Sequence, residues 1–288
     1  MRFLFVDQIT GMEPTTIRGR TTFSKDHPLQ YANPYGGQQI APGVISEAVG
    51  QLVSWLEIKN NDFTGRPVFL FADQIEIIKP VAPGATLEMN GRIEQSDQES
   101  FVFSGEASVD GDLVHRVHQC SGYNMPLENM EDPSVTRQRF QDLTNQGLTL
   151  KDPGASFNFD MLSGETFDLV INERIKMAHS ISENAPFYAD HFPRFPVTPI
   201  VMINEMIGIA TAKCLGKSTG QLFPRSVSGV KIKNFLAPNE PCEVTVTIKE
   251  VQPATKSSCG GISTVAEITK DGKKILRGRY KYDLVENV

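Results

Sequence analysis

The residues best suited to acid–base chemistry are a histidine and two glutamates, placed at related positions in the two halves of this 288-residue chain. His191 begins the stretch His-Phe-Pro-Arg-Phe-Pro-Val-Thr-Pro, and Glu205 follows it by fourteen positions. When the sequence is shifted by 158 residues without a gap, Glu47 falls on Glu205, whereas His191 falls on Asn33. A neutral imidazole can take a proton near neutral pH, and a carboxyl group can donate one. We therefore expect two related units and one working acid–base site per chain.

Composition excludes several classes of protein. The hydrophobic fraction of 40% and charged fraction of 22% are typical of a globular protein, and the net charge of −6 does not attract nucleic acid. Four cysteines lie far apart without a Cys-x-x-Cys pair, which argues against a zinc knuckle and fits a reducing compartment. No apolar run approaches the roughly 20 residues of a membrane span, and the apolar start is too short for a signal peptide. We expect a cytoplasmic protein without a membrane span.

Two helices are predicted at equivalent places in the halves. Residues 44–56 carry apolar side chains at helical spacing, and residues 200–215 are apolar on nearly every side, which is typical of a buried helix. Strand-like runs follow each helix, and each half ends with an Asp-Gly hairpin signal, at 110–111 and at 271–272.

These repeats predict an N-terminal domain at 1–125, a linker at 126–164 and a C-terminal domain at 165–288. The linker is polar and rich in turn residues, with a short helix expected at 134–143. One helix followed by a long antiparallel meander, made twice, is an α+β pattern in which each sheet wraps around its helix. Joining the two sheets edge to edge would hide both edges. The pattern resembles a tandem, or double, hotdog fold.

The segment 187–205 resembles the active-site segment of the 3-hydroxyacyl-(acyl carrier protein) dehydratases. That family has His-Phe-Pro, two variable residues, Pro-Val, one variable residue, Pro-Gly, and an acid fourteen residues after the histidine. The chain matches this pattern at His191, Phe192, Pro193, Pro196, Val197, Pro199 and Glu205. It departs from it at Ile200, where the family has glycine. Residues 3–7 and 42–48 also resemble that family's N-terminus and the start of its central helix.

The resemblance implies a site shared between two subunits, with the histidine from one and the acid from the other. In a tandem chain this pairs His191 with Glu47, and Asn33 with Glu205. Only the first pair has both a base and an acid, so we interpret Glu205 as part of a dead second site. The chain would form this pseudo-dimer internally, and a homodimer of chains stays open.

The chemistry that the resemblance implies is dehydration of a 3-hydroxyacyl thioester to the trans-2-enoyl thioester. His191 would remove the C2 proton, and Glu47 would protonate or orient the departing hydroxyl. The backbone N–H of Gly43 is our candidate for stabilising the thioester oxygen, and the Val197 carbonyl is expected to hold the other imidazole nitrogen. No cofactor or metal is implied, because the substrate is carried on the phosphopantetheine of an acyl carrier protein or coenzyme A.

Four basic residues, Arg194, Arg225, Lys231 and Lys233, are candidate contacts for that carrier or its phosphate. A solvated strand face explains them equally well. A metal site at His115, His118 and Cys120 is disfavoured because residues three apart on a strand point to opposite faces.

Three other functions stay open. A hotdog acyl thioesterase would use the same fold with a water nucleophile, and a non-catalytic acyl-binding subunit would explain the lost histidine. Isomerisation in addition to dehydration is disfavoured, because isomerising members of the family tend to have aspartate where this chain has Glu47 and Glu205. The sequence does not determine the acyl chain length, or whether the pathway is fatty-acid or polyketide biosynthesis.

Overall fold

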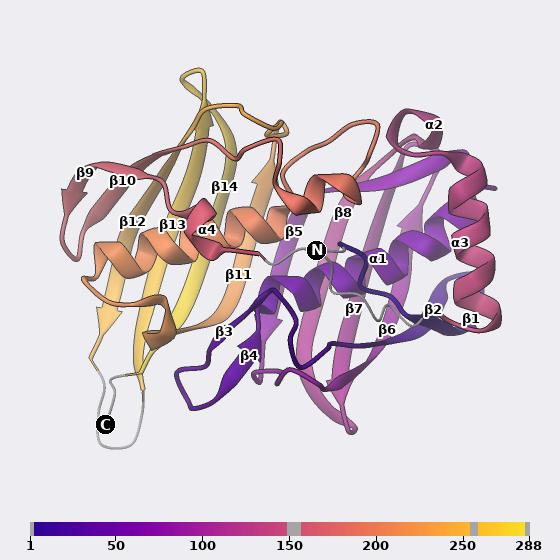
Figure 1. Cartoon of the computed structure of the whole chain (residues 1–288), viewed down its shortest axis with the longest axis horizontal. Coiled ribbons are helices and arrows are strands. Elements are labelled where there is room, and N and C mark those ends of the chain that lie inside the picture. Colours follow the sequence, from indigo (N-terminus) through magenta and orange to yellow (C-terminus); the bar gives the residue numbers. More distant parts are fainter. Residues whose placement is uncertain (1–2, 149–156, 254–258, 286–288) are drawn as a thin grey trace.

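One antiparallel sheet of twelve strands runs through the computed structural model, which describes residues 3–148, 157–253 and 259–285. Its order is β1-β2-β6-β7-β8-β5-β11-β14-β13-β12-β10-β9, so each half of the chain contributes one continuous half of the sheet. The two long helices, α1 and α4, lie on the same face of that sheet, one over each half (Figure 1).

The strands of the first half are β1 (Gln8–Met12), β2 (Thr16–Thr22), β5 (Gly65–Ile77), β6 (Thr86–Ser96), β7 (Ser100–Val109) and β8 (Asp112–Pro126), with a separate small hairpin of β3 (Gln30–Ala32) and β4 (Gln38–Ile40). Those of the second half are β9 (Glu165–Val170), β10 (Arg174–His179), β11 (Leu222–Ile232), β12 (Cys242–Gln252), β13 (Gly260–Lys270) and β14 (Lys273–Leu284). The α-helices are α1 (Pro42–Asn60), α2 (Leu127–Met130), α3 (Pro133–Asn145) and α4 (Ile200–Cys214), and the 3-10 turns are η1 (Phe159–Leu162), η2 (Pro186–Ala189) and η3 (Thr219–Gln221).

The two halves join through β5 and β11, which pair antiparallel at the centre of the sheet. Ser226 lies opposite Glu76, and Lys231 lies opposite Phe71. This pairing satisfies backbone groups that would otherwise form two open edges. The expected edge-to-edge joining is therefore confirmed.

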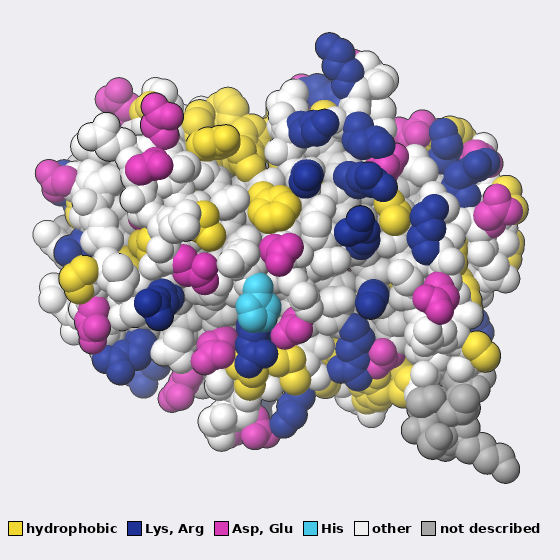
Figure 2. Space-filling model, turned by 180° about the vertical axis from the view of Figure 1, so that it is seen from behind, with side chains coloured by type: hydrophobic (Ala, Val, Ile, Leu, Met, Phe, Trp, Pro, Cys, Tyr) yellow, Lys and Arg dark blue, Asp and Glu magenta, His cyan; other side chains and the backbone are white. Residues whose placement is uncertain are grey.

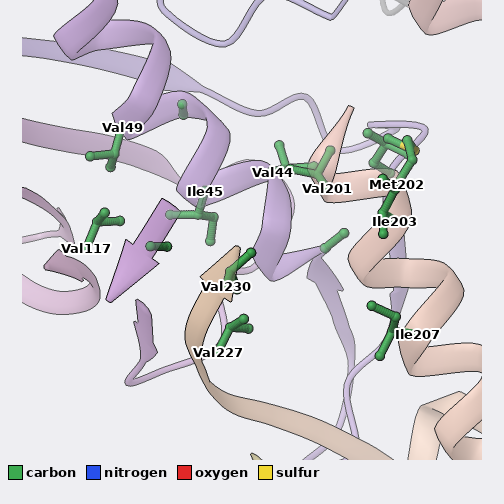
Figure 3. Packing of buried hydrophobic residues seen from close by; sticks show 14 of the residues in the cluster. Val44, Ile45, Val49, Val117, Val201, Met202, Ile203, Ile207, Val227 and Val230 are labelled. Carbon is green, nitrogen blue, oxygen red and sulfur yellow. The ribbon is translucent and has the colours of Figure 1, made fainter. Parts of the chain in front are cut away.

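Both predicted helices are present, and α1 begins with Pro42, whose missing N–H is not needed in a first turn. The apolar side chains in the middle of α1 are buried against the sheet. Among them, Val53 packs against Gly91 of β6. A Cβ at Gly91 would lie 2.3 Å from Val53 Cγ2, so glycine is what lets the helix approach this strand. Figure 3 shows apolar side chains of α1, α4 and β11, among them Val44, Val201 and Val230, gathered where the helices start.

The two predicted hairpins are also present. Asp110 and Gly111 join β7 to β8 with φ of 51° and 82°, and Asp271 and Gly272 join β13 to β14 with φ of 49° and 70°. Two successive residues with positive φ are the mark of a type I′ turn, which matches the twist of the flanking strands.

The connection between the halves contains the expected short helix, which is α3 and is capped by the side chain of Asp132. Part of the predicted linker, residues 149–156, lies outside the described residues. We keep 1–125 and 165–288 as proposed domains, because each contributes one half of the sheet. The sheet itself runs through both. The helices of the described chain include none long and apolar enough to cross a membrane.

Candidate active site

His191 and Glu47 line one cavity of about 80 Å³, although they come from different halves of the chain. His191 lies in the loop between η2 and α4, and Glu47 lies in the second turn of α1. Ile200, the first residue of α4, lines the same cavity, as does Arg66 at the start of β5. The junction between the halves therefore brings into one cavity the histidine and the glutamate that the repeat register paired.

The imidazole of His191 is held through its Nδ1. This nitrogen lies 2.9 Å from the carbonyl oxygen of Val197, so a neutral ring that donates here leaves the Nε2 lone pair free. The pKa of His191 is lowered to about 4, mainly by desolvation; the Val197 contact opposes this shift, and the nearby charge of Arg66 adds to it. The ring is therefore neutral at pH 7 and able to accept a proton.

The carboxyl group of Glu47 is shifted in the opposite sense. Desolvation raises its pKa, against smaller opposing effects of the Gln51 hydrogen bond and the Arg66 charge. The Nε2 of Gln51 donates to Glu47 Oε1 at 3.0 Å. The two groups that line the cavity are therefore shifted in opposite directions: the imidazole gives up its proton more readily than usual, and the carboxyl group holds its proton more tightly than usual.

An N-terminal segment, residues 3–6, forms part of the cavity wall through Phe3 and Leu4. Phe3 is 1% exposed, and its ring meets His191 edge to face with centroids 5.3 Å apart. Its backbone N–H donates to Asp190 Oδ2 at 2.9 Å, and Gln51 Oε1 accepts from the N–H of Phe5 at 2.8 Å. The sequence analysis missed Gln51, although its spacing of four residues from Glu47 on one helix indicates contact.

Phe192 and Arg66 hold the loop that contains His191. No pattern in the sequence predicted their contact. Phe192 has a φ of 56°, a left-handed conformation that costs a residue with a side chain about 1–2 kcal/mol. The guanidinium of Arg66 lies 5.5 Å from the centre of the Phe192 ring, and its Nε lies 3.3 Å from Glu131 Oε1. These contacts fix the backbone directly after His191.

Glu205 lines a different cavity, of about 150 Å³, in which Tyr31, Tyr280 and Tyr282 also expose surface. Desolvation raises the pKa of Glu205 to about 8. The expected partner Asn33 is not among the lining residues: its Oδ1 accepts from the N–H of Tyr35 in the turn between β3 and β4. The predicted Asn33–Glu205 pairing is wrong, because this hairpin places Tyr31 in the cavity instead.

Gly43 also requires a correction. It lines the Glu205 cavity and is absent from the lining of the His191 cavity. A Cβ at Gly43 would lie 3.2 Å from the Cβ of Val201, so this glycine allows the starts of α1 and α4 to approach each other. The helix start at the His191 cavity belongs to Ile200, the position where the family pattern has glycine.

Two of the four basic candidates are engaged within the protein. Arg194 donates to the carbonyl of Glu128 at 2.8 Å and to Asp132 Oδ2 at 3.0 Å, which attaches the His191 loop to α2 and α3. Arg225 donates to Asp283 Oδ2 at 2.6 Å and to the Ile78 carbonyl at 3.0 Å. Their structural bonds argue against the expected role as carrier contacts.

Lys231 and Lys233 are exposed, and the next two residues after Lys233 line the His191 cavity. Lys231 lies opposite Arg277 in the β11–β14 ladder. We define the basic patch as the exposed Lys231, Lys233, Arg279 and Lys281. The neighbouring Lys274 and Arg277 are paired with Glu267. Figure 2 shows Lys and Arg side chains gathered over the second half of the sheet, on the face turned away from α1 and α4.

His115 serves a different purpose from metal binding. It is fully buried on β8, and its Nε2 lies 2.8 Å from Ser46 Oγ. In the described ranges, no three His, Cys, Asp or Glu side chains are grouped to hold a metal ion.

Comparison with known proteins gives consistent matches. Residues 169–264 match the model of the ApeI-like family, described as ApeI dehydratase. The chain is 32% identical over 116 residues to the 3-hydroxyacyl-(acyl-carrier-protein) dehydratase FabZ of Mannheimia succiniciproducens, covering 39% of this chain and 77% of that protein. It is 34% identical over 117 residues to the FabZ of Syntrophotalea carbinolica, covering 39% of this chain and 78% of that protein.

Solved structures match along nearly the whole chain. A MaoC-like dehydratase superposes with a TM-score of 0.55 at 11% identity, covering 97% of this chain and 98% of its own. An acyl-ACP thioesterase from Bacteroides thetaiotaomicron superposes with a TM-score of 0.55 at 9% identity, covering 94% and 100%. These likenesses show the fold, which is the expected α+β double hotdog.

Proposed function

The chain belongs to the 3-hydroxyacyl-(acyl-carrier-protein) dehydratase family, and from this premise we propose that its His191 cavity converts a 3-hydroxyacyl thioester to the trans-2-enoyl thioester and water. The observation that carries the assignment to this cavity is that His191 and Glu47, from opposite halves, line it together. The family membership supports a role in fatty-acid biosynthesis.

In the proposed reaction, the Nε2 of His191 removes a proton from C2 of the substrate. The electron pair of the broken C–H bond is first shared with the thioester carbonyl as an enolate, and it then forms the C2–C3 double bond as the C3–oxygen bond breaks. The carboxyl group of Glu47 gives its proton to the departing hydroxyl, which leaves as water. The Val197 carbonyl keeps the proton on Nδ1, so that Nε2 is the nitrogen that acts as the base.

We assign the thioester oxygen to the start of α4. The first N–H groups of a helix have no acceptor within it and carry partial positive charge, which favours the negative charge that develops on this oxygen. Ile200 is the first residue of α4 and lines the cavity, so its N–H replaces that of Gly43 in this role.

An acyl carrier protein is the substrate carrier that the surface favours. The basic patch lies beside the residues that line the cavity, in a chain whose net charge is −6, and it suits an acidic partner. The proposed reaction needs no metal or cofactor beyond the phosphopantetheine of the carrier. The four cysteines are free thiols, which fits the cytoplasmic location expected for such a pathway.

Mass analysis of the product tests the proposal. Incubation of the protein with a 3-hydroxyacyl carrier protein is expected to lower the mass of the acyl group by one water and to keep the thioester intact. Release of a free 3-hydroxy acid would instead indicate the thioesterase alternative, and an unchanged substrate would indicate a binding subunit.

A further inference from the structure

Three cavities follow one another from His191 to Glu205. A middle cavity of about 60 Å³ lies between the two already described. It shares Glu47, Phe69, Ile200 and Ile232 with the His191 cavity, and Ser46, Ile75, Asn204 and Val227 with the Glu205 cavity. The shared walls place all three on one path that crosses the junction between the halves.

The middle of this path is apolar. Its walls include Phe71 and Phe103 from the first half of the sheet, and Val201 and Val230 from the second half of the chain. Figure 3 shows Val201, Val227 and Val230 together at the start of α4 and along β11. A narrow space with such walls suits a hydrocarbon chain.

The far end of the path is polar. Glu205 lies there with the side chains of Tyr31 and Tyr282, and the hydroxyl of Tyr280 donates to Asn204 Oδ1 at 3.0 Å. Within the described ranges, the Glu205 carboxyl makes no hydrogen bond to another protein group. The carboxyl group thus lines the cavity without a protein partner in that part of the chain, so it can bind an oxygen supplied by a ligand.

Resting on the function proposed above, we propose that the three cavities form one acyl tunnel, and that the Glu205 cavity selects substrates with a hydroxyl or carbonyl oxygen at the far end of the acyl chain. A protonated carboxyl group can donate a hydrogen bond to such an oxygen and accept one from a hydroxyl. A chain that ends in methyl would leave the carboxyl group unpaired. The Glu205 cavity would then serve recognition of the substrate.

The test compares two long substrates that differ in one oxygen, 3-hydroxydecanoyl and 3,10-dihydroxydecanoyl carrier protein. For the unmodified protein, kcat/KM is expected to favour the second substrate by about tenfold, the equivalent of about 1.4 kcal/mol. Glu205→Leu should remove this preference. Glu183→Leu, at an exposed glutamate outside the cavities, is the matched control and should keep it.

A second pair of variants covers the case in which Glu205→Leu does not fold. Tyr282→Phe removes one hydroxyl from the far end and should weaken the preference, whereas Tyr123→Phe, at a tyrosine that is 55% exposed, should not. Val227→Trp at the junction of two cavities should lower the turnover of the ten-carbon substrates relative to 3-hydroxybutyryl carrier protein.

The outcomes separate this inference from the function on which it rests. Equal kcat/KM for the two long substrates in the unmodified protein would overturn the far-end site. A preference that persists in both Glu205→Leu and Tyr282→Phe would overturn it as well. Failure of the unmodified protein to dehydrate any of the three substrates would overturn the proposed function instead.

Discussion

The imidazole of His191 is the group on which the proposed reaction most depends, because it is the base held ready by a defined contact. Its Nδ1 is occupied by the Val197 carbonyl, and desolvation keeps the ring neutral. The acid comes from the other half of the chain, with Gln51 holding its carboxyl group. The proposed dehydration needs one group that accepts a proton and one that donates a proton, and these two side chains are placed in one cavity.

Replacing His191 with alanine is expected to lower kcat by about 10²–10⁴-fold, because a general base is lost. Steady-state assays on a 3-hydroxyacyl thioester measure this loss. Far-ultraviolet circular dichroism and a thermal melt show that the variant remains folded. Turnover close to that of the unmodified protein would exclude His191 as the base.

Glu47→Gln is expected to reduce turnover far more than Glu205→Gln does, because only Glu47 lines the cavity of His191. Glutamine keeps the size of the side chain and removes the acidic proton. Both variants are assayed side by side on one short substrate, 3-hydroxybutyryl thioester. A severe loss in Glu205→Gln together with a mild one in Glu47→Gln would reverse the assignment.

At the scale of elements, the approach of α1 to α4 determines where each helix start lies. Gly43 lies close to Val201 across the helix pair, and Ile200, not Gly43, lines the His191 cavity. The β3–β4 hairpin determines which residue reaches the Glu205 cavity. It places Asn33 in a turn, and Tyr31 lines the cavity.

Gly43→Val is expected to destabilise the protein by about 1–3 kcal/mol, because added methyl groups must displace Val201. Gly208→Ala is the matched control on α4: its Cβ would meet nothing within 4 Å, and alanine favours a helix interior by about 1 kcal/mol. Urea unfolding gives both free energies. If Gly43→Val proved as stable as the unmodified protein, the close approach of the helices would not depend on this glycine.

Asn33→His is expected to restore no measurable dehydration in a His191→Ala background. The side chain of Asn33 is engaged in its own turn, and the residue does not line the Glu205 cavity. The double variant and His191→Ala alone are compared in the same assay. Rescue by Asn33→His would show that the second site can still work as a catalyst.

At the scale of the whole molecule, the halves share one sheet, and buried titratable groups lie on both sides of their junction. Desolvation lowers the pKa of His27 and of His191 to about 4, and that of His115 to about 3. Desolvation raises the pKa of Glu205 to about 8. The histidines therefore make the free energy of unfolding rise with pH, and Glu205 makes it fall with pH.

The free energy of unfolding is expected to be highest near pH 6.5. Between about pH 4 and 6.5 the unfolded chain binds protons on histidines that are neutral in the folded protein, so these groups make stability rise with pH. Above pH 6.5 that rise is complete. From 4.5 to about 8 the folded protein keeps a proton on Glu205 that the unfolded chain loses, so this group makes stability fall with pH.

Urea unfolding at a series of pH values checks this profile. A difference of one bound proton between the folded and unfolded states changes the free energy of unfolding by at most about 1.4 kcal/mol per pH unit. Glu205→Gln should make the decline between pH 6.5 and 8 less steep, and Glu183→Gln should not. Equal slopes in the two variants would show that Glu205 does not hold its proton in the folded state.

The sequence by itself determined the elements and the repeat. Apolar periodicity predicted α1 and α4, and the Asp-Gly pairs predicted two hairpins, because these signals act within a few residues of the chain. The repeat register also predicted that His191 meets Glu47, which lies 144 positions away, because related halves pack with the symmetry of a dimer.

Only the tertiary structure decided which helix start serves which cavity and which basic residues are free. Ile200 lines the His191 cavity where Gly43 was expected, Tyr31 lines the Glu205 cavity where Asn33 was expected, and Arg194 is bound to α2 and α3. Each of these outcomes depends on contacts between elements far apart in the chain. The spacing of residues along the chain does not indicate such contacts, because they form only when the two halves of the sheet join and bring the helix starts together.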